Sequence, residues 1–83
     1  MDPKRWSKPL TLESPKLGRY HTISSTSEAA LVLKNNWPIK RGQNLKRARK
    51  TCLEVLDGKK APSEARSAFI AAAVEAHVFV REK

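Results

Sequence analysis

The sequence contains a single cysteine, only three glycines and no long apolar run, and each scarcity excludes a class of protein. Cys52 has no partner for an internal disulfide, whereas small secreted domains usually carry several, so we expect a reducing, cytoplasmic location. The glycines are dispersed, so no glycine-rich loop is present to hold a phosphate. The longest uncharged apolar run, residues 68–74, is too short to span a bilayer, and the N-terminal charges precede no apolar stretch of the kind a signal peptide needs.

Acidic residues are also scarce relative to basic ones. Seventeen Lys and Arg stand against eight Asp and Glu, which gives a net charge of +9 on 83 residues. Such a charge creates a field that attracts anions, so nucleic acid, acidic proteins and anionic lipid are all eligible partners. The alternative is a lysine-rich solvated surface without a partner. A chain of this length forms at most one domain with a thin core, which association with a second copy would supplement.

The N-terminal part predicts a short arm and then a β-hairpin. Residues 1–8 carry three basic side chains around Trp6, and we interpret them as a flexible basic arm before a single domain over residues 9–83. Residues 10–12 and 20–23 alternate between apolar and polar types, and the segment between them contains Pro15 and Gly18, as turns do. A lone hairpin is barely stable, so this one must pack on other elements.

A first helix is predicted over residues 29–36. Ser25 and Glu28 have the spacing of a capping box, and Pro38 disfavours helix at the residue before it. Trp37 is therefore expected at the helix end as a large buried plate in the core.

The second helix is predicted over residues 44–57, because apolar side chains recur on one stripe at helical spacing and Gly58 supplies the stop signal. Cys52 lies in the middle of that stripe, so we expect a buried, inert thiol rather than a nucleophile. The stripe consists of Leu45, Ala48, Cys52, Val55 and Leu56.

The third helix is predicted to start at Pro62 and to bury a broad face of small alanines anchored by Phe69. Ile70 and Val74 lie on a different side of it, so this helix is either sandwiched within the chain or shared with a second copy. Arg66, among apolar neighbours, is expected to pair with an acid such as Glu28. Residues 78–80 either add a short strand or prolong the helix.

Together these elements predict an α+β fold: an N-terminal β-hairpin packed on three helices, with a short C-terminal strand as one of the two alternatives for residues 78–80. The order and spacing of the helical marks also resemble a known family, catalogued as domain of unknown function 982 and typical of rhizobia and related alphaproteobacteria. The marks cover much of the chain: residues 28–30, Trp37-Pro38, Gly42, Ala48, Cys52, Leu56 with Gly58, and residues 65–76.

The resemblance implies a small α+β bacterial domain and no activity, because none is assigned to the family. In the family pattern a glycine often follows the last alanine of the third helix. Here His77 takes that place, so the pattern does not predict how the helix ends.

No set of residues predicts catalysis, a cofactor or a metal. The candidate metal ligands are His21, Cys52 and His77, without the close pairs that a structural zinc site uses. The pairing of Cys52 with His77 has no support from spacing, and no two carboxylates stand in contrasting environments. We therefore expect a protein that is not an enzyme and that binds neither cofactor nor metal.

A basic segment is the main candidate for a binding surface. Six cations fall within residues 40–50, and Lys46, Arg47 and Lys50 share the helix face opposite the apolar stripe. Arg49 falls at the edge of the apolar arc, where it either snorkels or pairs with an acid. The candidate contacts with nucleic acid are Lys40, Arg41, Lys46, Arg47 and Lys50, with Trp6 and Tyr20 as the aromatics available for stacking.

We therefore predict a small basic protein of the cytoplasm that acts through protein–protein contacts, with self-association through Ile70 and Val74 as one form of such contact. The alternative is a nucleic-acid-binding protein that uses the basic 40–50 segment. A solvated basic face and an internally buried third helix remain the simpler explanations of the two surfaces.

Overall fold

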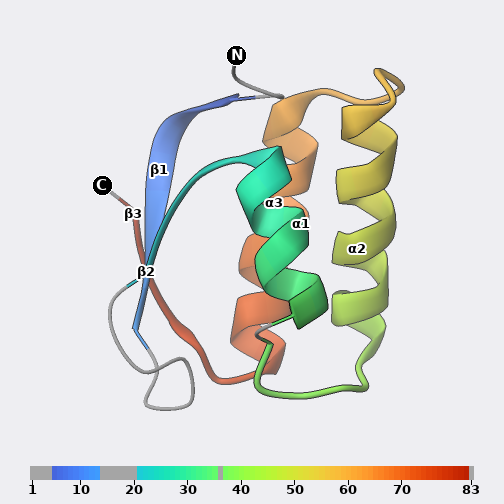
Figure 1. Ribbon diagram of the computed structural model, residues 1–83. Coiled ribbons are helices and arrows are strands. Elements are labelled where there is room, and N and C mark those ends of the chain that lie inside the picture. The colour runs from blue at the N-terminus through green and yellow to red at the C-terminus, as the bar shows by residue number, and fades with distance from the viewer. Residues whose placement is uncertain (1–4, 14–20, 36, 83) are drawn as a thin grey trace.

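The computed structural model of the chain describes residues 5–13, 21–35 and 37–82, and these form three strands and three helices (Figure 1). In chain order they are β1 (Arg5–Glu13), β2 (His21–Ser25), α1 (Thr26–Asn35), α2 (Gln43–Leu56), α3 (Pro62–Glu75) and β3 (Phe79–Glu82). The predicted α+β fold is confirmed. Of the two alternatives for residues 78–80, the strand is the one observed: Phe79 and Val80 belong to β3, and Val78 precedes it.

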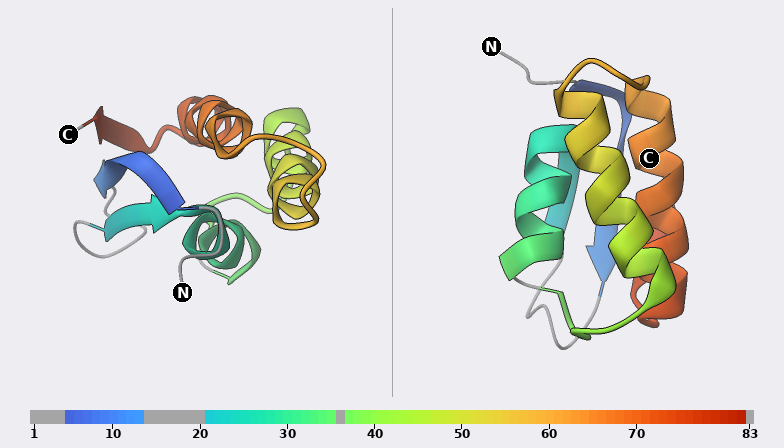
Figure 2. Two further views of the ribbon diagram at one scale, coloured as in Figure 1. Left: turned by 90° about the horizontal axis from the view of Figure 1, so that it is seen from above. Right: turned by 90° about the vertical axis from the view of Figure 1, so that its right-hand side faces the viewer.

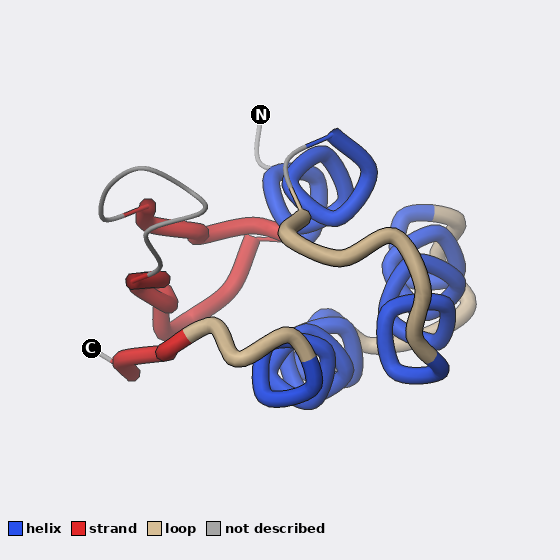
Figure 3. The backbone as a smooth tube through the Cα atoms, turned by 90° about the horizontal axis from the view of Figure 1, so that it is seen from below, coloured by secondary structure: helices blue, strands red, loops and turns tan. Residues whose placement is uncertain are grey.

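The three strands form an antiparallel sheet in the order β2-β1-β3, with β1 in the centre. Leu10 pairs with Ile23, and Leu12 follows on the same face of β1, so all three side chains point inward and are fully or almost fully buried. Thr11 and Thr22 pair between them on the opposite face, where their hydroxyls lie 3.5 Å apart. Figure 3 shows the consequence: all three helices lie on one side of the sheet.

The core lies where the sheet and the three helices enclose a central space, with α1 and α3 next to the sheet and α2 farthest from it (Figure 2). Phe69 of α3 is fully buried at this centre. Its ring meets Trp37 edge-on at 5.3 Å between centroids and Trp6 at 6.0 Å, arrangements that aromatic pairs prefer. The prediction that Trp37 packs in the core is confirmed, and the alanine face of α3 is buried around Phe69.

The structure corrects the prediction for the N-terminal arm. Residues 5–8 belong to β1, and Trp6 is only 4% exposed, so it is not available for stacking on a base. Its Nε1–H donates a hydrogen bond of 3.0 Å to the buried Oγ1 of Thr26. Strand β1 continues beyond a register shift between Arg5 and Leu10, a stretch that contains Pro9, which has no N–H to give to a ladder. Residues 1–4 and Tyr20 lie outside the described residues.

Helix α1 begins at Thr26, earlier than predicted, and its capping box is partly as expected. The backbone N–H of Glu28 donates to Ser25 Oγ at 3.2 Å, as the sequence pattern predicts. The return bond differs, because Glu28 Oε1 accepts from the backbone N–H of Ser24 at 2.7 Å rather than from that of Ser25.

Helix α3 ends in a left-handed residue that is not glycine. His77 has φ 59°, its N–H donates to Val74 O at 3.2 Å, and the N–H of Val78 donates to Ala73 O at 2.8 Å. This pair of bonds is the Schellman motif, and α2 ends in the same way at Gly58, with φ 82°. His77 therefore occupies the place where the family pattern often has glycine, and the helix stops there without one.

Candidate binding groove between helices α2 and α3

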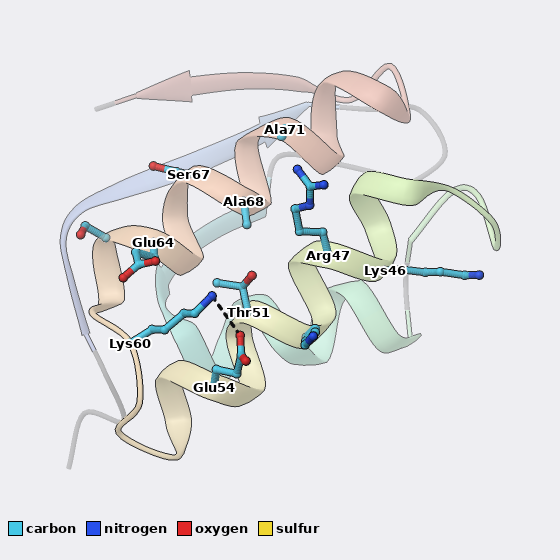
Figure 4. A pocket seen from close by; sticks show the side chains of 11 residues that line it. Lys46, Arg47, Thr51, Glu54, Lys60, Glu64, Ser67, Ala68 and Ala71 are labelled. Atoms are coloured by element: carbon cyan, nitrogen blue, oxygen red, sulfur yellow. Dashed lines mark ion pairs between the residues drawn. The ribbon is translucent and has the colours of Figure 1, made fainter.

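A groove of about 770 Å³ runs over the outer surface where α2 and α3 lie side by side (Figure 4). The two helices run in opposite directions and are joined by a short connection after α2 (Figure 1). The groove is lined by Lys46, Arg47, Lys50, Thr51, Glu54, Lys60, Ser63, Glu64, Ser67, Ala68 and Ala71.

Three of the five cations predicted as binding residues come together in this groove. Lys46, Arg47 and Lys50 project from α2, are exposed and line one wall. Lys40 and Arg41 are also exposed, but they precede α2 and do not line the groove. Within the described part of the chain, the three groove cations that come from α2 form no ion pair or side-chain hydrogen bond. The prediction of their common face was correct, while their role in binding stays a prediction.

The far end of the groove is electrically mixed. Lys60 Nζ lies 3.2 Å from Glu54 Oε1, the contact drawn as a dashed line in Figure 4, so these two charges largely neutralise each other. Glu64, in the first turn of α3, adds a further exposed carboxylate at this end. The groove is therefore strongly basic at its α2 wall and close to neutral near the start of α3.

The floor of the groove is made of small side chains. Ala68 and Ala71 of α3 are half-buried, and Thr51 of α2 is 7% exposed. Among the described residues, none that lines the groove is aromatic. A floor of this kind lets another backbone approach closely and supplies apolar contact without a deep pocket.

The sequence of α2 explains why its outer face is basic. Its apolar stripe is turned into the core, where Leu45, Ala48, Cys52 and Val55 are fully buried, so the opposite face is left to charged residues. Arg49 is the exception and points to α1. Its Nε and Nη2 donate to the carbonyl of Leu33 at 3.2 and 2.8 Å, which satisfies a carbonyl in the last turn of α1. The sequence suggested snorkelling or an acid as alternatives, and the partner is instead a backbone oxygen.

The first turn of α2 is held by a side chain from the end of α3. Gly42, the residue before α2, provides no side-chain cap. The Glu75 carboxylate replaces it, accepting from the N–H groups of Asn44 and Leu45, both at 3.1 Å. A Cβ at position 42 would displace the Glu75 carboxylate, and the φ of Gly42, 158°, is one that other residues rarely adopt, so both features favour glycine there. This contact fixes α2 relative to α3 and with it the two walls of the groove.

The apolar edge predicted for self-association is smaller than the sequence suggested. Ile70 is half-buried and packs against the core, whereas Val74 is 68% exposed. Neither residue lines the groove. Other large exposed apolar side chains, Leu31, Leu53 and Phe79, belong to three different elements. Of the two residues predicted for self-association, Val74 is therefore the one that is exposed.

Arg66 makes a hydrogen bond to the backbone of the sheet. Its Nε donates to the carbonyl of Lys8 in β1 at 3.0 Å, and Glu28 is engaged with Ser24 instead. The structural role expected for Arg66 is thus reached through a backbone acceptor. Arg66 and Arg5 also line a smaller cavity of about 290 Å³, together with Trp6, Pro62 and Ser63.

The remaining chemical candidates are dispersed. Cys52 is fully buried, and burial raises the pKa of its thiol to about 11, so the nucleophilic thiolate is scarce at neutral pH. His21 and His77 are exposed on the sheet and after α3. Over residues 5–13, 21–35 and 37–82, no three His, Cys, Asp or Glu side chains gather as metal ligands would. The same residues contain no helix with the length and apolar character needed to cross a bilayer.

The antiparallel sheet covered on one face by three helices places this chain among small α+β proteins, and the basic groove is a concave surface formed by two of those helices. The chain belongs to the family described as "Protein of unknown function (DUF982)", whose family model matches residues 8–80. The predicted resemblance is thereby confirmed.

One solved structure is closely similar in fold. It is the NMR structure of protein Atu1219 from Agrobacterium tumefaciens, a structural genomics target, with a TM-score of 0.81 and 29% sequence identity. The similarity covers 99% of this chain and 81% of the Agrobacterium chain. No curated protein matches the sequence. Neither the description of the family nor that of the Agrobacterium protein states an activity, so function must be argued from the groove.

Proposed function

We propose that this protein is a non-enzymatic binding protein of the cytosol that acts through contacts with another protein, and that the α2–α3 groove is its contact surface. The observation that carries the proposal is the basic wall of the groove. Lys46, Arg47 and Lys50 are exposed on one helix, line one concavity and meet no acid within the described residues. Charges arranged in this way attract and orient an acidic partner.

Rigidity of the scaffold supports the same conclusion. Both walls are helices of 14 residues, and the Glu75 contact ties the start of α2 to the end of α3. A binding surface on such elements is held in one shape before the partner arrives, which reduces the entropy lost on binding. The buried, protonated thiol of Cys52 and the scattered histidines offer no competing catalytic explanation.

Affinity capture from a native cytosolic extract tests the proposal. The groove variant changes Lys46, Arg47 and Lys50 to Gln, and the matched control changes Lys40, Arg41 and Lys59 to Gln. Both variants lose three positive charges from exposed positions, but only the first loses them from the groove. We expect the groove variant to lose the captured protein and the control variant to retain it. Equal loss from both variants, or no captured protein, would refute the proposal.

Nucleic acid is the second candidate, because all five predicted cations from Lys40 to Lys50 are exposed. Two observations weaken it. Trp6, expected to stack on bases, is buried, and the groove contains the carboxylates of Glu54 and Glu64. If all five cations reach phosphates of a duplex, log affinity falls with log salt with a slope of roughly −4 to −5. Nuclease treatment of the captured material separates this candidate from a protein partner.

Self-association is tested on the other surface. Light scattering over a range of concentrations reports whether a second copy binds, and Val74→Lys removes the exposed apolar contact without touching the core. A monomer at all concentrations would remove the homodimer and leave the groove proposal intact.

A further inference from the structure

We propose that the occupant of the α2–α3 groove is an acidic amphipathic helix of a partner protein. This inference rests on the proposed function and adds the structural class and charge of the partner. It is argued from the shape of the groove, its floor and the placement of its charges.

The groove has two helical walls that extend alongside each other (Figure 4). On α2 the lining residues run from Lys46 to Glu54, and on α3 from Ser63 to Ala71. Eight residue steps on each wall correspond to about 12 Å at the rise of an α-helix, or roughly two turns of a bound helix. A third helix packs into the furrow between two helices by the same ridge-and-groove contacts that hold helices together within a domain.

The small floor sets the distance of approach. Thr51, Ala68 and Ala71 are small, and the one long side chain that reaches toward the two alanines in Figure 4 is the exposed Arg47, so an incoming helix can place its apolar side chains on the alanines beside the guanidinium. Anchors spaced at i, i+3 or i+4, and i+7 on one face are the usual way in which a helix occupies a groove. The apolar face of the occupant therefore meets the alanines.

The charges of the groove determine where the bound helix is acidic and in which direction it lies. An occupant is expected to carry carboxylates along the side that faces α2, where they would lie opposite Lys46, Arg47 and Lys50. At the other end Glu54 is already neutralised by Lys60, and Glu64 remains exposed, so a neutral or basic residue fits there. An occupant with acids all along its length meets repulsion at Glu64, whereas an acidic amphipathic helix with one neutral end does not.

Other occupants fit less well. A second copy of this chain carries a net charge of +9 and presents the same basic wall, so like charges would face each other across the groove. A nucleic acid backbone is negative throughout and meets the Glu64 carboxylate as it passes. These occupants become alternative outcomes of the experiment rather than parts of the proposal.

The test uses the full chain and two synthetic peptides of identical composition. One peptide places Leu and Ala on one helical face and Glu on the adjacent flank, and the other is a scrambled sequence with no amphipathic face. Fluorescence anisotropy is expected to give at least about tenfold tighter binding for the amphipathic peptide, which corresponds to about 1.4 kcal/mol. NMR shift changes are expected at the groove residues, above all Thr51, Ala68 and Ala71.

Two variants localise the effect. Ala71→Tyr fills the floor without changing charge, and Arg47→Gln removes one charge of the wall; circular dichroism verifies that each is folded. Both variants are expected to lower the affinity for the amphipathic peptide at least about threefold. Lys59→Gln, which lies outside the groove, is expected to leave that affinity unchanged.

Equal binding of the two peptides would overturn the inference, as would tighter binding of a duplex DNA of equal charge or a lack of response to Ala71→Tyr. If the amphipathic peptide does not bind while capture of a cytosolic protein still depends on the groove cations, the inference of a helical partner is wrong and the proposed function is retained. If capture fails as well, both fall.

Discussion

The capping of α2 by Glu75 allows the most demanding test of the structure. The first N–H groups of a helix have no partner within it, and a side chain at the N-cap position normally accepts one of them. Here Gly42 cannot, and the carboxylate of Glu75 accepts from both Asn44 and Leu45. The perturbation is Glu75→Ala, which removes both acceptors and the negative charge next to the positive end of the helix dipole.

The magnitude follows from two contributions. Loss of an N-cap typically destabilises by about 1 kcal/mol, and loss of a carboxylate from a partly buried helix N-terminus adds about 1 kcal/mol. We therefore expect Glu75→Ala to lower the free energy of unfolding by about 2 kcal/mol. For a domain of this size that corresponds to a fall in Tm of about 8–16 °C. Glu75→Gln retains one acceptor oxygen and loses the charge, so about half of that effect is expected.

Gly42 supplies an internal check. A Cβ at this position meets Glu75 Oε1, and the φ of 158° strains any side chain there, so Gly42→Ala should destabilise the protein in both backgrounds but more while the long Glu75 side chain is present. In the Glu75→Ala background the same substitution should have a much smaller effect. The double-mutant cycle is expected to give a coupling of about 1 kcal/mol or more, as for residues in direct contact.

The assay is urea unfolding monitored by circular dichroism, with the m-value compared between variants to confirm that only stability has changed. Asp57→Asn is the matched control, because it removes the same charge at the other end of α2, where a carboxylate does not favour the dipole. The reasoning is refuted if Glu75→Ala changes stability by less than about 0.5 kcal/mol, or if Gly42→Ala has equal effects in both backgrounds.

Three further predictions concern other residues. His77→Gly should raise the free energy of unfolding by about 1 kcal/mol, because glycine adopts the left-handed conformation without penalty. His77→Ala is the control, and equal stability of the two variants in denaturant unfolding would contradict this explanation. Trp6→Phe should lower the free energy of unfolding by about 1–3 kcal/mol, because the buried hydrogen bond from the indole to Thr26 is lost. A double-mutant cycle with Thr26→Val, measured by thermal unfolding, should show coupling between the two residues, and its absence would count against that bond. Burial raises the pKa of the Cys52 thiol from 9.0 to about 11, so the protonated thiol favours the folded state and this contribution is fully present below pH 9. The free energy of unfolding of the wild type relative to that of Cys52→Ala should therefore fall between about pH 9 and 11. A difference that does not change with pH would contradict this.

The sequence predicted the parts of the fold that depend on local periodicity. The α2 stripe is buried as predicted except for Leu56, which is half-buried, and the helix stops at Gly58. The alanine face around Phe69 is buried as predicted except for Ala68, which is half-buried. The basic face of α2 was predicted by the same rule, because it is what remains when the stripe is buried. Local patterns thus identified the residues of one wall of the candidate site.

The features that were missed depend on contacts between distant segments. Trp6 stands among basic residues and before Pro9, so its surroundings resemble an arm, and only the pairing of Arg5 with Ser25 brings it over the core. Glu75 gives no local sign that it caps another helix. The available signal was negative: Gly42 precedes α2 with no side chain that could cap it.

The groove could not be predicted either, because it requires the position of α3 beside α2. Charge pattern identified Lys46, Arg47 and Lys50, but the α3 wall contains only ordinary residues of a helix surface, such as Ser67 and Ala71. Their significance comes from packing, which in turn depends on the Glu75 contact.

The central position of β1 has a consequence for the order in which the chain can fold. Strand β1 pairs with β2 on one side and with β3, Phe79–Glu82, on the other. During synthesis the first edge of β1 can be covered early, but the second stays open until all three helices have been made and β3 has followed them. An open strand edge is a template for pairing with other chains. The interval before β3 docks is thus the period in which the open edge of β1 most exposes the nascent chain to misassembly.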